Sequence, residues 1–278
     1  MDTSSISFTA LYTGQVWYEN GLSAPFFTSG RGRLMYLGLQ PLEKVAEWMI
    51  GTNLHHILLQ RHRIIDHRIT QLIEDGATQV LEIACGLSPR GYQFSRRYPH
   101  LNYVEADLPN MAKRKQELLA SQQAIGPNQQ VIACNILAEG KPHGLDHILQ
   151  DVLDPNQKTI VITEGLINYF SRDAITPFWQ TLARQGKQYP ELHYLADCYP
   201  MHQQASLYKY IKPVMKTLGT ITRAEVNPLF ESDQQLMDHF KQCGFAGIQV
   251  HQPEDYYDTL AIPHSRGQSF TRVLEAKA

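Results

Sequence analysis

The 278-residue sequence lacks several features that define whole classes of protein. It has no apolar run long enough to cross a bilayer, which argues against a membrane-spanning chain. Its four cysteines lie far apart and form no C-x-x-C unit, so neither a dense disulfide framework nor a zinc site is indicated. The twelve histidines form no H-E-x-x-H or similar ligand set, and we expect no bound metal.

A surplus of basic charge is also missing. The formal net charge is −2, whereas a chain that binds nucleic acid or a membrane surface is expected to be strongly basic; a local basic patch stays open. The first residues carry no basic lead before an apolar run, so no secretory signal is apparent. With 43% hydrophobic residues, the composition allows a sizeable core. We predict a reduced, cytoplasmic, enzyme-like protein.

From Gln79 onward, short β-rich runs alternate with helical stretches. Strands are expected at 79–85, 102–107, 130–134, 158–163 and 193–196, and two later runs, 248–250 and 270–274, would close the sheet. Helices are expected between them at 89–98, 109–121 and 145–152. This alternation predicts an α/β fold built on a doubly wound, mostly parallel, Rossmann-like sheet of seven strands.

Two later helices have recognisable starts or ends. Apolar residues repeat at helical spacing over 174–183, and Pro177 suits a helix start capped by Thr176 better than a helix interior. Ser232 opens a capping-box sequence, and Gly244 is placed to end that helix.

Two regions fall outside the alternation. Residues 1–70, with a helical pattern over about 45–69, are predicted to form an N-terminal helical cap, and residues 71–278 the main domain. Residues 200–228 are predicted to be a helical insertion between late strands. Both are expected to cap the active site by folding over the carboxyl ends of the strands, where open α/β sheets bind ligands.

Aromatic residues are dense near the N-terminus, at Tyr12, Trp17, Tyr18, Phe26 and Phe27. We interpret most of them as core of the cap, with some left to face a substrate. The candidate substrate contacts are Tyr12, Trp17, Tyr199 and His202.

The most informative segment is 82–91, Glu-Ile-Ala-Cys-Gly-Leu-Ser-Pro-Arg-Gly. A glycine just past a buried strand, here Gly86, lets the chain turn sharply and lets a ligand approach the backbone. The N–H groups of the following helix then face that ligand. The segment lacks G-x-G-x-x-G because Ala84 fills the first position, and it lacks the Gly-Lys-Ser/Thr of a P-loop.

Polar residues follow the next three strands as well. Asp107 ends the second strand, 21 residues after Gly86, a spacing suited to accepting both ribose hydroxyls of an adenosine. Asn135 follows the third strand, and its amide can pair with an adenine edge. Glu164 follows the fourth, where a carboxylate faces a cationic amino acid portion or a sulfonium. Together these residues predict an adenosyl-containing cofactor.

Simpler interpretations stay open for single residues. Asp107 can serve as a helix N-cap before Pro109, and Gly86 and Asn135 are both common in turns. Arg90 either binds a cofactor or substrate carboxylate or pairs with Glu105 as structure.

The segments 86–90, 103–109 and 163–170, together with Lys115, resemble the leucine carboxyl methyltransferase family, which includes bacterial O-methyltransferases of polyketide-type metabolism. The resemblance covers about residues 55–175. It implies a class I methyltransferase that uses S-adenosylmethionine. It also implies that Asp107 holds the ribose, that Gly86 lies beside the methionine portion and that Glu164 lines its end.

By the same resemblance, Arg61 is placed to bind the cofactor carboxylate, as a guanidinium fork can do in a bidentate manner. The predicted cofactor set is completed by Glu82, Arg90, Leu108 and Ile136. The chain departs from the family pattern where Ala84 replaces Gly, where Ser88-Pro89 replaces Asp-Thr and where Asn135 replaces Asp. These departures affect substrate identity more than cofactor binding.

The acceptor decides whether a base is needed. A carboxylate has a free pKa of about 4 and is already an anion at neutral pH, whereas a hydroxyl needs a positioned base. No histidine stands in a recognisable base motif, which favours a carboxylate, although His143, His202 or His251 could converge in space. The hypotheses are an O-methyltransferase for a small-molecule carboxylate or hydroxyl, a protein C-terminal carboxyl methyltransferase, and a cofactor-binding scaffold without turnover.

Overall fold

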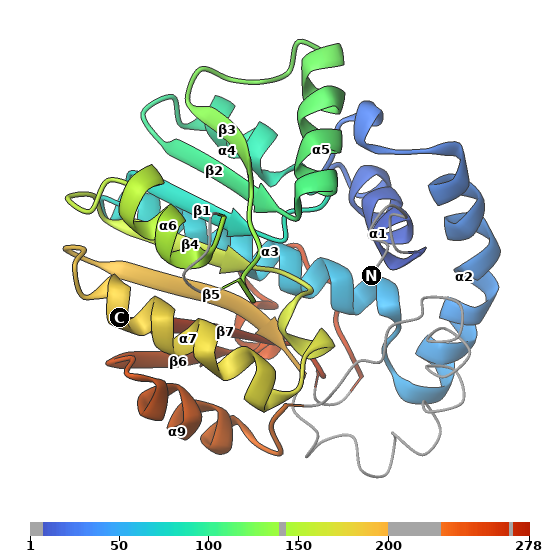
Figure 1. The fold of residues 1–278 in the computed structure, drawn as a ribbon. Coiled ribbons are helices and arrows are strands. Elements are labelled where there is room, and N and C mark those ends of the chain that lie inside the picture. The colour runs from blue at the N-terminus through green and yellow to red at the C-terminus, as the bar shows by residue number, and fades with distance from the viewer. Residues whose placement is uncertain (1–7, 139–142, 200–228, 267–268) are drawn as a thin grey trace.

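The computed structural model describes residues 8–138, 143–199, 229–266 and 269–278. One sheet runs through this part of the chain, with helices on both sides (Figure 1). The predicted insertion at 200–228, including His202, lies outside the described residues.

The sheet has seven strands in the order β3-β2-β1-β4-β5-β7-β6. The strands are β1 Gln79–Ile83, β2 Asn102–Asp107, β3 Gln129–Ala133, β4 Thr159–Thr163, β5 Leu192–Cys198, β6 Gly247–His251 and β7 Arg272–Lys277. Strands β1 to β5 pair in parallel, and β7 runs antiparallel to both β5 and β6. The predicted α/β class and mostly parallel, seven-stranded sheet are confirmed. The strand order reverses between β1 and β4, the point where such sheets bind ligands.

Helices connect the strands and form the N-terminal region. They are α1 Phe8–Glu19, α2 Gly30–Ile50, α3 Leu54–Glu74, α4 Arg90–Arg97, α5 Pro109–Ser121, α6 Leu145–His147, α7 Arg172–Gly186 and α9 Asp233–Cys243, with short turns η1 Pro25–Phe27, η2 Ile148–Val152, η3 Ile167–Tyr169 and η4 Pro253–Tyr256. Ser232 caps α9 by accepting from the backbone N–H of Gln235 at 3.2 Å, and Gly244 ends it with φ +105°, as predicted.

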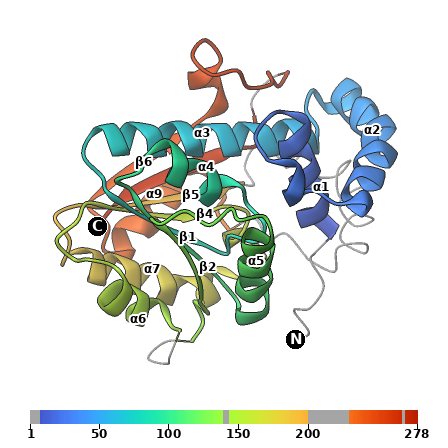
Figure 2. The same cartoon turned by 90° about the horizontal axis from the view of Figure 1, so that it is seen from above.

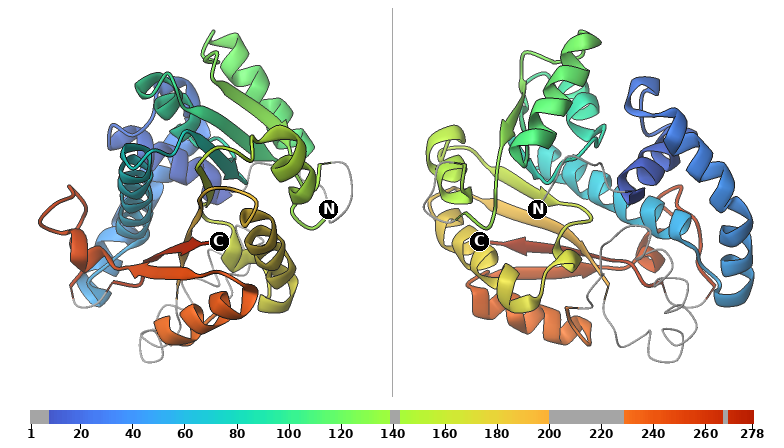
Figure 3. Two further views of the ribbon diagram at one scale, coloured as in Figure 1. Left: turned by 90° about the vertical axis from the view of Figure 1, so that its left-hand side faces the viewer. Right: turned by 45° about the vertical axis from the view of Figure 1, so that its right-hand side comes forward.

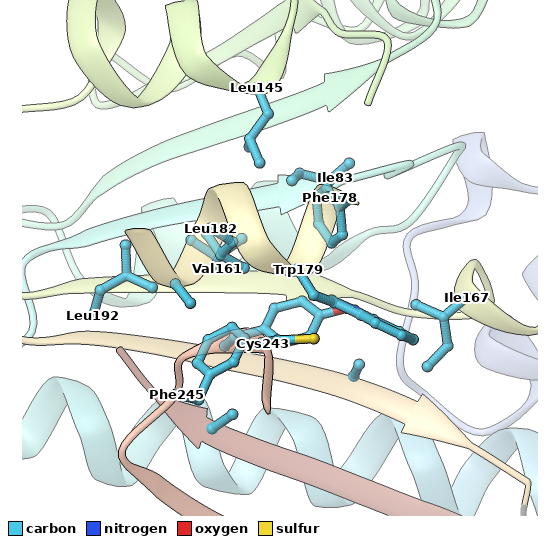
Figure 4. Close-up of a cluster of buried hydrophobic side chains, with 14 of the residues drawn as sticks. Ile83, Leu145, Val161, Ile167, Phe178, Trp179, Leu182, Leu192, Cys243 and Phe245 are labelled. Carbon is cyan, nitrogen blue, oxygen red and sulfur yellow. The ribbon is translucent and has the colours of Figure 1, made fainter. Parts of the chain in front are cut away.

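Both faces of the sheet are buried, so its central strands read as continuous apolar runs. On one face, α6, α7 and α9 cover the sheet (Figure 2). Side chains such as Ile83 and Val161 are buried beneath these helices (Figure 4). On the other, α3 and α4 cover Val80, Ile160 and neighbouring residues (Figure 3). The strand ends are therefore held in place by core packing on both sides.

Two details differ from prediction. Pro177 lies inside α7, which begins at Arg172 behind the N-cap Ser171, so the predicted start at Thr176 is wrong. The helix accepts the proline close to its N-terminus, and the Thr176 hydroxyl donates to the Arg172 carbonyl at 2.7 Å. The strand predicted at 270–274 is β7, and it begins at Arg272.

The helical pattern over 45–69 is two helices, because Gly51 ends α2 with φ +77° and Asn53 caps α3. Helix α3 packs against the sheet and runs across residue 70. The division of the chain into a cap and a main domain at that residue stays a prediction.

Candidate active site

The turn after β1 has an unusual backbone. Ala84 and Gly86 have φ values of +54° and +48°, both in the left-handed region that residues other than glycine rarely adopt. A Cβ placed on Gly86 would meet no atom within 4 Å, so there is open space beside its Cα. This backbone can therefore be approached closely from that side.

Asp107, at the end of β2, lies against this turn. Its Oδ2 accepts from the backbone N–H of Gly86 at 2.7 Å, and its Oδ1 accepts from the N–H of Leu108 at the same distance. Burial raises the pKa of Asp107, although these two hydrogen bonds work in the opposite direction. The structure thus brings Gly86 and Asp107 together, as predicted. The alternative that Asp107 is the N-cap of the following helix is wrong, because Leu108 is the N-cap of α5 and no side chain caps this helix end.

The residues after β3 extend the same edge. The N–H of Cys134 donates to the Asp107 carbonyl at 2.7 Å, which holds this segment beside β2. Asn135 is exposed, and its Oδ1 accepts from the N–H of Leu137 at 3.1 Å. Ile136 is half-buried and packs against the main core. The turn role of Asn135 is therefore observed, and its amide stays accessible.

Glu164, at the end of β4, is surrounded by cationic and imidazole groups. Its Oε1 accepts from Arg61 Nε at 3.0 Å, and its Oε2 lies 2.6 Å from Arg90 Nη2 and 2.9 Å from His62 Nδ1. Burial alone would raise the pKa of Glu164, but His62 and the two arginines hold it well below its usual range. The carboxylate is therefore ionised at neutral pH.

Arg90 is the centre of a buried network. It is fully buried, and besides Glu164 it contacts Asp66 Oδ1 at 2.6 Å and Glu82 Oε1 at 2.7 Å. The other oxygen of Glu82 accepts from the Tyr103 hydroxyl at 2.9 Å. Direct cofactor contact by Glu82 and Arg90 stays a prediction, because the observed contacts of both are structural.

The predicted pairing of Arg90 with Glu105 is wrong. Glu105 contacts Lys115 instead, and both side chains are fully buried. A Cβ on Gly91 would clash with the Glu105 carboxyl, so α4 packs directly on this pair. Arg90 instead contacts Asp66 of α3, Glu82 of β1 and Glu164 after β4.

Arg61 joins β4 to β5. Its Nη1 lies 3.0 Å from Asp197 Oδ2 and 2.9 Å from the hydroxyl of Tyr199, which itself donates to Asp197 at 2.7 Å. The N–H of Gly165 donates to the other Asp197 oxygen at 2.6 Å. Arg61 and Tyr199, two predicted site residues, are thus in direct contact.

The aromatic residues of the N-terminal region are mostly core. Tyr12 is buried and donates to Glu43 Oε1 at 3.0 Å, which favours a structural role over substrate contact. Trp17 is also buried, and its ring lies 4.7 Å from that of His62. Trp17 therefore contacts the Glu164 network only through His62 and does not lie at the strand ends.

Several members of this network were not predicted from sequence, namely His62, Asp66, Tyr103 and Asp197. Asp197 is the last residue but one of β5 and continues the series of polar residues at strand ends, a signal the sequence contains. His62 and Asp66 are four residues apart and share a face of α3, which helical spacing alone could indicate. Tyr103 has no such signal, because it lies inside a buried strand.

The network has an excess of negative charge. Two guanidinium groups, of Arg61 and Arg90, and the imidazole of His62 meet four carboxylates, those of Asp66, Glu82, Glu164 and Asp197. A ligand with cationic groups would reduce this imbalance. S-adenosylmethionine carries a sulfonium and an ammonium group, and Gly86 leaves space beside the turn, so the residues present fit this cofactor.

Two features are absent from the described residues. Nowhere among them do three or more His, Cys, Asp or Glu side chains gather in a way that could hold a metal ion. Likewise, none of the helices described has the length and apolar character that crossing a bilayer requires.

Solved structures with the same fold are methyltransferases. A Thermobifida fusca protein assigned as a methyltransferase matches 99% of this chain and 96% of its own, with a TM-score of 0.61 and 14% identity. PigF, solved with SAH, matches 97% of this chain and 68% of its own, with a TM-score of 0.51 and 13% identity. At these identities the likeness establishes the fold.

Sequence comparison establishes the family. Leucine carboxyl methyltransferase 1 of Eremothecium gossypii is 28% identical over 118 residues, which span 36% of this chain and 35% of that relative. The match thus spans about a third of the relative's length. The model of the family described as "Leucine carboxyl methyltransferase" matches residues 23–183, more than half of the chain and all four strand ends from Gly86 to Glu164. The chain therefore belongs to the leucine carboxyl methyltransferase family.

Proposed function

We propose that the chain transfers the methyl group of S-adenosylmethionine to an oxygen of a carboxylate acceptor. The bound cofactor supplies an electrophilic methyl group on a sulfonium, so the acceptor needs alignment and exclusion of water more than activation. A carboxylate, with a free pKa of about 4, is already ionised and requires no base. A hydroxyl acceptor requires one.

The observation that carries this proposal is the burial of His62. Of the described histidines, it alone lies in the network at the strand ends, and it is fully buried between Trp17 and Glu164. A side chain enclosed in this way cannot reach an acceptor hydroxyl. The arrangement therefore favours an acceptor that arrives as an anion.

The residue roles form part of the proposal. Asp107 is proposed to bind the ribose, with Gly86 and Leu108 shaping the turn around it, and Asn135 and Ile136 to line the adenine. Glu164 is proposed to face the ammonium end of the cofactor. Arg61 is proposed to bind the cofactor carboxylate with the part of its guanidinium that Glu164 and Asp197 leave free.

The acceptor belongs to one of two classes. We favour a small-molecule carboxylic acid. A protein C-terminal carboxylate is the second candidate, and it is supported by the name of the Eremothecium relative, which specifies a leucine carboxyl group.

Transfer of a labelled methyl group tests the proposal. The chain is incubated with S-adenosylmethionine labelled in its methyl group and either a panel of small carboxylic acids and phenols or a peptide ending in leucine. The same peptide with a C-terminal amide is the matched control. Mild alkali releases methanol from a methyl ester but not from an ether, so base-labile volatile label identifies a carboxylate acceptor. Label that is stable to alkali would contradict the proposal, and binding without any transfer would favour the scaffold.

The pH dependence of the rate gives a second test. A carboxylate acceptor predicts a rate that is flat from about pH 6 to 9, since neither the acceptor nor the network must lose a proton in that range. A rise centred near the free histidine pKa of about 6.5 would instead indicate a histidine base and a hydroxyl acceptor.

A further inference from the structure

Helix α2 carries an apolar face that no other described residue covers. The described part of the chain exposes ten large hydrophobic side chains, and six of them belong to this helix: Leu34, Leu37, Leu42, Val45, Trp48 and Met49. Leu34 and Trp48 are 74% and 76% exposed. The inner face of α2 packs against the core of α1 and α3, and the helix lies at the outer edge of the molecule (Figures 1 and 2). Concentration on one helix distinguishes this face from scattered surface residues and indicates a contact surface.

Four of these side chains form a symmetric stripe together with Pro41. Leu34, Leu37, Pro41, Val45 and Trp48 follow one another at intervals of three and four residues, which keeps them on one side of the helix. The stripe is symmetric about Pro41, with apolar residues four and seven positions away in both directions. At 1.5 Å per residue it is about 21 Å long.

This symmetry suits a second copy of the chain. If two α2 helices pack antiparallel with a two-fold axis at Pro41, Leu37 of each copy faces Val45 of the other, and Leu34 faces Trp48. A two-fold interface requires such self-complementarity. Gly38 is exposed on this side and has no atom within 4 Å of a Cβ position, so the backbones can approach closely.

The charges on α2 agree with the antiparallel arrangement. Arg31 and Arg33 are exposed near its N-terminus, and Glu47 is half-buried near its C-terminus. Antiparallel packing brings Arg33 of one copy near Glu47 of the other, whereas parallel packing would align like charges. A membrane-binding helix is expected to be rich in Lys and Arg along its polar face, whereas the basic residues Arg31, Arg33 and Lys44 of α2 are accompanied by Glu47.

We propose that two copies of this chain associate through the exposed stripe of α2, antiparallel and with the two-fold axis at Pro41. A single helix pair is at the small end of specific interfaces, so we expect a weak dimer. This proposal is independent of the acceptor.

Sedimentation velocity of the full chain, from about 1 to about 200 µM, tests the association. The wild type is expected to shift from monomer to dimer over this range. Leu37→Glu and Val45→Lys each place a charge against an apolar partner and are expected to weaken the dimer at least about a hundredfold. In the double variant the new charges face each other across the axis, and association is expected to recover. Ile125→Glu, at an exposed apolar residue outside α2, is the matched control and is expected to leave the dimer unchanged.

Several outcomes would overturn the proposal. A wild type that stays monomeric throughout, with Leu37→Glu less stable to urea, would mean that another part of the same chain covers the stripe. Dimerisation that persists in both single variants would place the interface elsewhere. A monomer that sediments with anionic phosphatidylserine vesicles would assign the stripe to a membrane surface.

Discussion

Two carboxylates at the ends of β2 and β4, the strands on either side of β1, are held in opposite ways. Asp107, after β2, accepts hydrogen bonds from the backbone of Gly86 and Leu108, and burial raises its pKa. Glu164, after β4, is held by side chains that carry or can carry positive charge, and its pKa is lowered. The fold therefore depends on the carboxylate of Glu164 but does not require that of Asp107. The predictions below test this difference.

Glu164→Ala is expected to have the largest effect on stability. It leaves Arg90 with one carboxylate fewer in a fully buried position and removes a partner of Arg61 and His62. Breaking a buried ion pair from one side costs about 3–5 kcal/mol, which urea unfolding measures. Glu191, which pairs with lysines at the surface, is the control, and Glu191→Ala should cost about 0–1 kcal/mol. Equal losses in the two variants would refute the structural role of Glu164.

Asp107→Ala is expected to act on cofactor binding instead. Two charge-assisted hydrogen bonds to a ribose are worth about 1.5–3 kcal/mol each, so the Kd for S-adenosylmethionine should rise by at least about a hundredfold. Stability should change by less than about 1 kcal/mol, because the N–H groups of Gly86 and Leu108 lie in half-buried residues that water can reach. Calorimetry and urea unfolding measure the two quantities. An unchanged Kd in a folded variant would remove the ribose assignment.

The two carboxylates should also respond to acid with opposite sign. Glu164 has a lowered pKa in the folded state, so its contribution to the free energy of unfolding is present above the unfolded value of about 4.3 and is lost as the pH falls through the folded pKa. Asp107 has a raised pKa, so the folded state gains stability as the pH falls through that value.

Matched amide variants isolate these contributions. The difference in free energy of unfolding between wild type and Glu164→Gln should shrink as the pH drops from 6 toward 3. The difference between wild type and Asp107→Asn should move the other way over the same range. Urea unfolding at each pH measures both, and parallel curves would show that the two carboxylates do not differ as described.

The sequence contains enough information for the sheet and for the strand-end residues, because both depend on local patterns. A buried β-rich run and the polar residue that follows it occupy adjacent positions, so the places of Asp107 and Glu164 could be predicted. The partners of Arg90 could not, since Asp66, Glu82 and Glu164 come from three elements that only the folded chain brings together. For a related reason, the sequence does not predict that Pro177 lies inside α7. Burial of Phe178 and Trp179 against the sheet outweighs the local cost of a proline in this helix.

The smallest expected effect concerns Ala84, where this chain departs from the glycine of its family. Its φ of +54° costs an L-residue about 1–2 kcal/mol, and glycine avoids that cost. Glycine also gives the unfolded chain more conformational freedom, which offsets about 0.5–1 kcal/mol of this gain. Ala84→Gly should therefore raise the free energy of unfolding by roughly 0.5 kcal/mol. Ala84→Val is the contrasting control, because a β-branched side chain is rarer still in this region and should destabilise the fold. If both variants proved equally stable, the turn before Gly86 would relax without the left-handed conformation. The position of Asp107 would then depend less on the backbone of this turn than its hydrogen bond to Gly86 suggests.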